Sequence, residues 1–532
     1  MDEYNVFKDC GTSEHPPEGY KVIKVRMIYD VKHDARHKAR LVAGGHLTDI
    51  PTDSVYSGVV SLRGFRLFLF LAELNSLELW ATDITSAYLE AYTDEKVCIK
   101  AGPEFGPLNG HWLIIQKALY GLRSSGARWH EWLADCLRDE GWTSCRAEPD
   151  IWMRKQGDIY EYIAVYVDDL ALAMKNPASF VDILKAKYNF HFKGTGPLTF
   201  HLGADFYRDS HGTLSMAPRK YIERMLTNYE LIFGEKPRMT VYSPLEKGDH
   251  PELDDSELLD QTGITQYQSL IGSLQWAITL GRFDIATAVM TMSSFRSAPR
   301  RGHLDRVRRI CGYLARMKHA TIKFRTHEPD YSDLPPNDYN WLDTYGNVKE
   351  LVPDDAPEPL GKKVVLTHYV DANLFHDALT GHSVTGILHM VNATPVEWYS
   401  KKQATVETAT YGSEFVAACT CIEQIIDLRN TLRYLGAPIH ECSYMFGDNE
   451  SVVNSASIPH AKLHKRHTAL SFHRVREAIA SKYVLFKYLQ GTHNPADILS
   501  KHWAYSGTWQ MLQCLLFWEG DPMLSEAKQE TN

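Results

Sequence analysis

The chain has 532 residues, of which 44% are hydrophobic and 23% charged, so it has room for several globular domains and is not a single small binding module. Its formal net charge of −9 at first argues against a nucleic-acid partner, because phosphate contacts supply most of the affinity for nucleic acids. The excess acid is local, however. Residues 327–360 carry 1 basic and 9 acidic side chains, whereas residues 1–326 carry 41 of each and residues 361–532 carry 15 and 16.

Cysteine usage and hydropathy exclude several other classes of protein. The nine cysteines are scattered without a CxxC pair, which is typical of reduced intracellular thiols and not of a disulfide framework or a zinc ribbon. Apolar runs fall short of the ~20 residues that a membrane span requires. No signal peptide is recognisable at the first residues. We therefore expect a cytosolic or nuclear protein without a membrane partner.

The N-terminal part alternates short apolar runs with amphipathic stretches. Residues 22–29, 163–167 and 170–174 are predicted strands, and residues 128–139 have apolar side chains at helical spacing. Residues 296–318 predict a further helix with an apolar face and eight Lys or Arg side chains against one acid. Such a run is usually a solvated face, but this one is also a candidate for contact with a nucleic-acid backbone.

The acidic stretch 327–360 contains six prolines and predicts a solvated connector at a domain boundary. After it, residues 363–370 and 384–391 are predicted strands, residues 407–435 a long helix and residues 443–447 another strand. The first and last of these strands are each followed by an aspartate. Strand ends that present carboxylates are the usual way in which an α/β fold assembles a metal site.

Two motifs in the N-terminal part carry carboxylates. Asp168 and Asp169 in Tyr-Val-Asp-Asp lie between two predicted strands, and Asp83 ends another apolar run. Paired aspartates in a turn have a simple structural explanation, since they hydrogen-bond to their own backbone. A third carboxylate favours chemistry instead, because three gathered acids repel one another unless divalent cations neutralise them.

These motifs resemble the catalytic motifs of reverse transcriptases. Further phrases resemble the Pol polyprotein of copia-type (Pseudoviridae) LTR retrotransposons, over about residues 20–503: Lys-Ala-Arg-Leu-Val-Ala-Gly-Gly at 38–45, Ala-Leu-Tyr-Gly-Leu at 118–122 and Tyr-Gln-Ser-Leu-Ile-Gly-Ser-Leu at 267–274. The resemblance implies that Asp83 and Asp168 bind two metal ions and that Asp169 supports them.

The resemblance also implies substrate contacts. Arg40, with Lys32 and Lys38, would hold the incoming triphosphate, for which guanidinium and ammonium groups are suited. Tyr88 would lie under the sugar and exclude a 2′-hydroxyl, although a half-buried helix aromatic is the alternative interpretation. Gly121 would let the template strand approach the backbone.

A second set of carboxylates follows the acidic stretch. Its members are Asp371, Glu414, Asp448 and Asp497, and each alone has the alternative interpretation of a helix cap or a surface acid. Their order, with Trp-Tyr-Ser-Lys-Lys-Gln at 398–403, resembles the RNase H domain of the same elements. That resemblance implies that the four acids hold two metal ions and that Asn449 and Ser451 contact a sugar hydroxyl.

The expected fold class is an α+β and α/β multidomain protein, a right-hand reverse transcriptase (fingers, palm and thumb) followed by an RNase H-like α/β domain. The expected segments are an N-terminal extension (1–19), fingers and palm (20–240), thumb and connection (241–326), an acidic linker (327–360), the RNase H-like domain (361–503) and a tail (504–532).

The resemblance implies an RNA-directed DNA polymerase with ribonuclease H activity and two Mg²⁺ (or Mn²⁺) per site. The implied partners are an RNA template, a DNA primer, the RNA/DNA hybrid, dNTPs and other Gag or Pol products of the element. The implied location is a cytoplasmic virus-like particle or the nucleus. Two alternatives remain, a polymerase with an inactive nuclease and a relic that binds nucleic acid or a partner without catalysis.

Overall fold

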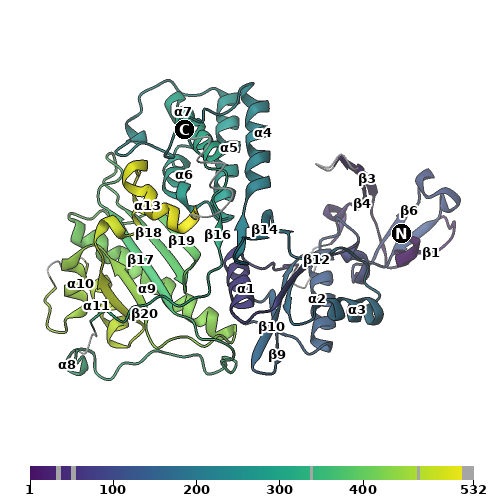
Figure 1. Cartoon of the computed structure of the whole chain (residues 1–532). Coiled ribbons are helices and arrows are strands. Elements are labelled where there is room, and N and C mark those ends of the chain that lie inside the picture. Colours follow the sequence, from purple (N-terminus) through teal and green to yellow (C-terminus); the bar gives the residue numbers. More distant parts are fainter. Residues whose placement is uncertain (32–36, 50–54, 336–338, 464–467, 518–532) are drawn as a thin grey trace. The chain divides into compact units, whose positions relative to one another are not determined.

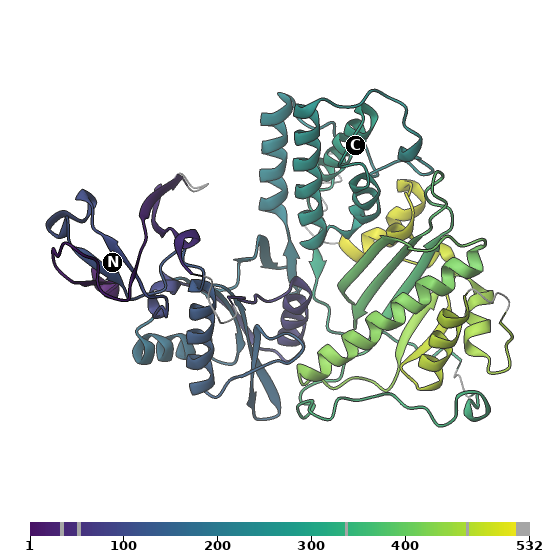
Figure 2. The same ribbon diagram turned by 180° about the vertical axis from the view of Figure 1, so that it is seen from behind.

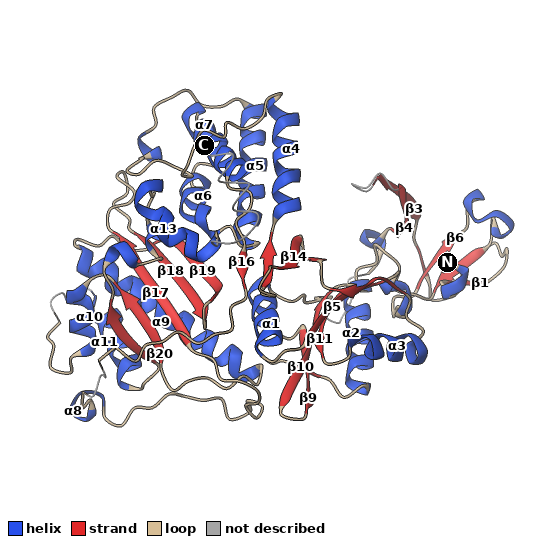
Figure 3. Ribbon diagram, viewed as in Figure 1, coloured by secondary structure: helices blue, strands red, loops and turns tan. Residues whose placement is uncertain are grey.

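The computed structural model describes residues 1–31, 37–49, 55–335, 339–463 and 468–517 (Figure 1). The chain divides into two compact units. The first unit comprises Met1–Ser61 and Leu77–Leu198, and the second comprises Leu62–Ser76 and Thr199–Asn532. Both combine helices with sheets (Figure 3), which confirms the expected mixed α and β multidomain class.

The first unit contains a six-stranded sheet of order β12-β5-β11-β10-β9-β8, a four-stranded sheet of order β1-β7-β6-β2 and the β3-β4 hairpin. Its strands are β1 (Phe7–Asp9), β2 (Lys21–Val22), β3 (Val25–Val31), β4 (His37–Ala43), β5 (Glu78–Ile84), β6 (Val97–Lys100), β7 (Trp112–Ile115), β8 (Thr143–Ser144), β9 (Ile151–Gln156), β10 (Ile159–Tyr166), β11 (Asp169–Met174) and β12 (Phe192–Pro197). Its α-helices are α2 (Ser125–Asp139) and α3 (Pro177–Tyr188).

The core of the first unit forms where α2 packs on the six-stranded sheet. Trp129, Leu133 and Leu137 recur every four residues along α2, so they share one helix face, and all three are buried. They belong to the same apolar cluster as Val165 and Leu172 of the central strands. Burying each such side chain contributes roughly 1.5–3 kcal/mol. The predicted helix at 128–139 is confirmed and begins three residues earlier.

The second unit contains a small sheet of order β13-β14-β15-β16 and a five-stranded sheet of order β19-β18-β17-β20-β21. Its strands are β13 (Phe200–His201), β14 (Ala204–Arg208), β15 (Leu214–Ala217), β16 (Ile322–Lys323), β17 (Leu366–Asn373), β18 (Val384–Val391), β19 (Thr394–Lys402), β20 (Ser443–Gly447) and β21 (Val484–Tyr488). Its α-helices are α1 (Leu62–Leu74), α4 (Arg219–Phe233), α5 (Gln261–Thr279), α6 (Ala286–Ser293), α7 (Arg301–Arg316), α8 (Leu342–Tyr345), α9 (Thr410–Tyr434), α10 (Glu450–Ser457), α11 (Ala469–Ala480), α12 (Asp497–Ser500) and α13 (Tyr505–Leu516).

The five-stranded sheet is mixed. β17, β18 and β19 form an antiparallel meander, whereas β20 runs parallel to β17 and β21 parallel to β20. The chain passes from β19 to β20 through α9, which lies across one face of the sheet (Figure 2). The predicted strands at 384–391 and 443–447 are confirmed. The strand expected at 363–370 begins and ends three residues later, so Asp371 lies inside β17.

Helix α1 belongs to the second unit although it lies within the segment expected to form the fingers and palm. Its Arg66 is buried, and the Nε donates to the carbonyl oxygen of Val396 at 2.6 Å. The guanidinium also lies 4.3 Å from the ring centroid of Trp398 on β19. Burial lowers the pKa of Arg66 to about 10, which still leaves it charged at neutral pH. The six expected segments therefore remain a prediction, because the compact units divide the chain differently.

The acidic stretch is mostly exposed where the structure describes it, but two of its residues anchor it to the second unit. Trp341 is only 9% exposed and belongs to the apolar core around α9. Glu350 accepts hydrogen bonds from the Nε and Nη2 of Arg429 at 2.6 and 2.8 Å, and it also pairs with Arg433. The expectation of a solvated connector was wrong at Trp341 and Glu350, because composition counts charges without their partners. Two arginines of α9 neutralise an acid that the sequence pattern assigns to solvent.

Two buried histidines lie beside the five-stranded sheet. The Nδ1 of His376 contacts the amide nitrogen of Asn373 at 2.9 Å, so it is the hydrogen-bond acceptor. The Nε2 donates to the hydroxyl of Thr291 at 3.1 Å, since that hydroxyl donates to a backbone carbonyl. Burial lowers the pKa of His376 to about 4 and the pKa of neighbouring His502 to about 3. Both are therefore neutral in the folded chain near pH 7.

None of the helices that the structure describes is both long enough and apolar enough to cross a bilayer.

Replacement of Glu350 should destabilise the second unit. In Glu350→Gln the guanidinium of Arg429, which is 1% exposed, loses its buried counter-charge, so we expect a loss of about 3 kcal/mol in the free energy of unfolding, measured by urea denaturation. Asp354→Asn, at an exposed acid of the same stretch, is the control and should change this energy by less than about 0.5 kcal/mol. Equal losses for both variants would contradict the role of Glu350 as the counter-charge of Arg429.

The buried histidines should make stability depend on pH. Between the unfolded value of 6.5 and a folded value of about 4, the unfolded chain binds a proton at His376 that the folded chain excludes. Stability is therefore highest above pH 6.5 and decreases on acidification, by up to about 1.4 kcal/mol per pH unit for each such histidine. His376→Gln should flatten this slope in urea denaturation series from pH 7.5 to 5. An unchanged slope would show that His376 does not carry it.

Candidate active sites

The hairpin turn expected around Asp168 is present in the first unit. Strands β10 and β11 pair antiparallel with Tyr166 opposite Asp169, which leaves Val167 and Asp168 as the two-residue loop. Val167 has a φ of 59°, a conformation that a β-branched residue rarely adopts and that costs of order 1–3 kcal/mol. The indole nitrogen of Trp129 donates to the Val167 carbonyl at 2.7 Å and holds the turn.

Asp83 lies directly across from this turn. It is paired with Asp169 in the β5–β11 ladder, and the next backbone amide, that of Ile84, donates to the carbonyl of Asp168 at 2.8 Å. Burial, with the charges of Asp168 and Asp83, raises the pKa of Asp169 to about 6. Burial and the charge of Asp83 also raise the pKa of Asp168. The three acids predicted from sequence are thus neighbours on adjacent strands.

A lysine that the sequence analysis missed pairs with one of these acids. Lys193 lies opposite Asp83 in the β12–β5 ladder, and its Nζ is 2.8 Å from the Asp83 Oδ1. The cross-strand register would have revealed it, but that register is not readable from a single sequence. Among the described residues, the oxygens of Asp83, Asp168 and Asp169 do not form a group as close as the one found in the second unit.

The residues expected to contact the triphosphate lie partly outside the described chain. Lys32 falls in the undescribed stretch 32–36. Lys38 and Arg40 are two residues apart on β4, so their side chains share one face of the hairpin, and both are half-buried. The charge of Lys38 opposes the rise that burial causes in the pKa of Asp168, which places Lys38 near the acids. Their contact with a triphosphate remains a prediction.

Tyr88 and Gly121 have local packing roles of their own. The half-buried ring of Tyr88 lies 4.9 Å from that of Tyr120, in agreement with the alternative of a half-buried aromatic, and its contact with a sugar is untested. Gly121 has a φ of +92°, and a Cβ there would lie 2.2 Å from the carbonyl oxygen of Ala43. A close approach of β4 therefore already requires glycine at this position, whether or not a template strand also passes.

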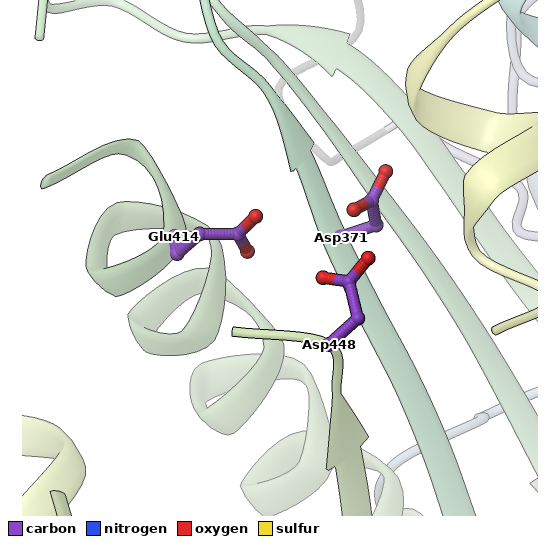
Figure 4. Close-up of side chains that lie close together, drawn as sticks. All are labelled: Asp371, Glu414 and Asp448. Atoms are coloured by element: carbon purple, nitrogen blue, oxygen red, sulfur yellow. The ribbon is translucent and has the colours of Figure 1, made fainter. Parts of the chain in front are cut away.

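Three of the four expected carboxylates of the second unit converge. Oxygens of Asp371, Glu414 and Asp448 lie within 4.8 Å of one another, and Figure 4 shows the three side chains directed toward a common space. The topology explains the arrangement. β17 and β20 are parallel neighbours, with Val370 beside Gly447, so Asp371 and the residue after β20 lie at the same level of the sheet. The second turn of α9 supplies Glu414.

The charge of this cluster is poorly compensated. Burial raises the pKa of Glu414 well above its ordinary value, and the charges of Asp371 and Asp448 raise it further. Burial and the charge of Asp371 also raise the pKa of Asp448, to about 6. A buried set of only carboxylate oxygens is the donor set that Mg²⁺ and Mn²⁺ prefer. These residues therefore fit a divalent ion.

Asp497, the fourth acid, does not belong to this close group. Its Oδ1 lies 2.5 Å from the Nζ of Lys501, and the same ammonium lies 3.5 Å from the Oδ2 of Asp371. The hydroxyl of Ser500 also donates to that Oδ2. Asp497 was predicted from the sequence, whereas Ser500 and Lys501 were not. Their positions three and four residues further along a predicted helix start were the available signal.

Gly386 allows α12 to reach Asp371. It lies opposite Asp371 in the β17–β18 ladder, and a Cβ there would be 2.6 Å from the Ala496 carbonyl oxygen and 2.7 Å from the Ser500 nitrogen. The buried amide of Asn494 fixes the preceding loop, since it donates to the Val370 carbonyl at 2.9 Å. Because Gly386 has no side chain, α12 packs directly against β18, and this brings Asp497 close to the sheet.

The two predicted sugar contacts follow β20. Asn449 is the N-cap of α10, and its side-chain oxygen accepts from the Val452 amide at 3.2 Å. Ser451 is exposed on the first turn. Both lie within three residues of Asp448, but their contact with a sugar hydroxyl remains a prediction.

The predicted basic helix is α7, and most of its charge is neutralised within the second unit. Arg306 bonds to Asp249 and Asp254, and Arg309 to Glu246. Arg308 pairs with Glu235. The apolar face is buried as predicted. Contact with a nucleic-acid backbone remains a prediction, and these arginines would have to exchange acidic partners for phosphates to make it.

Comparisons with known proteins agree with the motifs of the first unit. Residues 12–246 match the family model described as reverse transcriptase (RNA-dependent DNA polymerase). The chain is 24% identical over 508 residues, 91% of its length, to the retrovirus-related Pol polyprotein from transposon TNT 1-94 of Nicotiana tabacum. Over most of its length the chain is therefore similar to copia-type retrotransposon Pol polyproteins, and residues 12–246 match a reverse transcriptase.

A second similar protein is the retrovirus-related Pol polyprotein from transposon RE1 of Arabidopsis thaliana, 24% identical over 496 residues and 91% of the chain. The chain spans only 35% and 31% of these two relatives, about a third of their length. Among solved structures, a foamy viral protease-reverse transcriptase in complex with RNA/DNA hybrid aligns with 96% of this chain and 81% of its own, at 11% identity and a TM-score of 0.30. That score is too low to support an argument.

Gly386→Ala should disturb the Asp371–Asp497 side of the second site. The new methyl group would overlap backbone atoms of α12, which cannot move as a flexible side chain does, so we expect a loss of about 1–3 kcal/mol in unfolding free energy. Hydrogen exchange of the amides at 496–501 should accelerate. Gly507→Ala is the control, because a Cβ there meets open space. Equal exchange in Gly386→Ala and the wild type would contradict the close contact.

Proposed function

We propose that the first unit carries the active site of an RNA-directed DNA polymerase that extends a DNA primer on an RNA template with dNTPs. The family match over residues 12–246 supports the activity. The observation that carries the site is the register of β5 and β11, which sets Asp83 opposite Asp169 beside the strained turn of Asp168. Acids on adjacent strands next to a strained loop are typical of a catalytic centre.

Each residue has a defined task in this proposal. Asp83 and Asp168 bind the divalent ions and Asp169 supports them. Two bound Mg²⁺ or Mn²⁺ supply the charge that phosphoryl transfer requires. Arg40 and Lys38, with Lys32, hold the triphosphate of the incoming nucleotide. The Tyr88 ring excludes a 2′-hydroxyl, and Gly121 borders the template strand.

We also propose that the second unit is a ribonuclease H that cleaves the RNA strand of the hybrid. The convergence of Asp371, Glu414 and Asp448 within 4.8 Å carries this part, because like charges at that distance oppose folding unless a cation joins them. Asp497 completes the set of ligands. Asn449 and Ser451 contact the RNA sugar hydroxyl, which distinguishes RNA from DNA.

The proposed partners are the RNA template, the DNA primer, the RNA/DNA hybrid and dNTPs. The Pol polyproteins to which the chain is similar are about three times as long as this chain. We therefore propose that other Gag and Pol products of the element act with it, in a cytoplasmic particle or in the nucleus.

The two activities should separate by mutation. We expect Asp168→Asn to reduce primer extension on an RNA template with Mg²⁺ at least about 100-fold while sparing RNA cleavage, because each variant removes a charged ligand from one site only. Asp448→Asn should do the reverse. Extension is followed on sequencing gels, and cleavage with a labelled hybrid.

The controls are Asp158→Asn and Asp354→Asn, two exposed acids, one in each unit, which should leave both activities at wild-type level. Extension without cleavage in the wild type would favour the alternative of an inactive nuclease. A wild type that performs neither reaction, yet binds hybrid, would favour the non-catalytic alternative.

A further inference from the structure

A lysine ammonium lies among the carboxylates of the second unit. The Nζ of Lys501 is 2.5 Å from Asp497 and 3.5 Å from Asp371, so it bridges the fourth acid and a member of the close trio. The Asp371 side chain is only 2% exposed, whereas that of Lys501 is 35% exposed. The ammonium therefore reaches a buried acid from the solvent side.

This contact differs from an ordinary charge pair on a helix surface. In the pair Arg138–Asp135 both side chains are nearly 60% exposed, and such pairs contribute little. Lys501 instead follows α12, which is anchored to the sheet by Ser500 and Asn494. The fold thus holds a positive charge at this edge of the carboxylate cluster.

A divalent ion held between Asp371 and Asp497 would take the position that this ammonium fills. Mg²⁺ binds carboxylate oxygens at about 2.0–2.1 Å, a distance that requires the space the ammonium fills. The lysine side chain is a flexible four-carbon stem with a compact charge at its end. The ammonium is able to leave toward solvent without movement of the backbone, since its side chain is already partly exposed.

We infer that Lys501 occupies the cation position between Asp371 and Asp497 when no hybrid is bound and releases it to the second divalent ion. The inference rests on the metal-dependent nuclease proposed above. It accounts for the asymmetry of the site, in which Asp371, Glu414 and Asp448 converge and Asp497 faces a lysine. Lys501 is then a positioning residue that limits the hybrid-free site to one tightly bound ion.

The number of bound ions tests this. We would count bound Mn²⁺ by electron paramagnetic resonance in the full chain without hybrid. The ions lost in Asp448→Asn identify how many of them belong to the nuclease site. Lys501→Met should gain one tight ion at this site, with a dissociation constant about tenfold lower than in the wild type, as expected for a group that acts on metal ligands. Lys501→Arg keeps the charge and should keep the wild-type count. An unchanged count in Lys501→Met would overturn the inference.

A second measurement needs no variant. Acetylation of Lys501 by acetic anhydride, followed by peptide mass spectrometry, should increase several-fold when Mg²⁺ is added to the hybrid-bound chain, because the displaced ammonium becomes accessible. Exposed Lys482 is the internal reference. Equal reactivity with and without Mg²⁺ would overturn the inference even if the wild type cleaves hybrid. Release of Lys501 in a chain that cleaves nothing would support the cation exchange and contradict the nuclease.

Discussion

Both candidate sites bring carboxylates together, and burial raises the pKa of two acids in each, Asp168 and Asp169 in the first unit and Glu414 and Asp448 in the second. The chain offsets this repulsion with its own cations, each supplied by a different element. Lys193 of β12 pairs with Asp83, and Lys501 after α12 lies between Asp371 and Asp497. Among the described residues no ion pair is formed with Glu414, and burial raises its pKa well above the ordinary value.

Acids and cations from different elements also neutralise one another outside the two sites. Glu350 of the acidic stretch is held by two arginines of α9, and arginines of α7 are held by the acids that precede α5. Net charge, which first argued against a nucleic-acid partner, is therefore a poor guide to exposed charge in this chain. An acid-rich segment is anchored to the core by Trp341, and the arginines of a base-rich helix are largely paired with acids of the same unit.

The elements with strong local patterns were predictable from the sequence. β18 and β20 match their predicted limits, and α2 and α9 differ from theirs by one to three residues, because apolar periodicity determines a helix or a strand locally. The acids were predictable because aspartates follow strands in a recognisable order. The roles of Lys193, Ser500 and Lys501 were not, even where helix spacing offered a signal, since they depend on register and on the close contact that Gly386 permits. The ion pairs of Glu350 were equally unpredictable from the sequence, because its partners lie about 80 residues further along the chain.

These missed residues share one property. Each acts on an acid that the sequence did identify, so the sequence located the negative charges and the fold determines their counter-ions. A metal ion that binds either site must therefore compete with a lysine that already neutralises part of the charge. The lysine carries one positive charge and a divalent ion carries two. The lysine therefore lowers the affinity of the site for a metal ion, while the site keeps its selectivity for a divalent ion. The flexible lysines thereby connect the stability of the metal-free fold to the ease with which the sites are loaded.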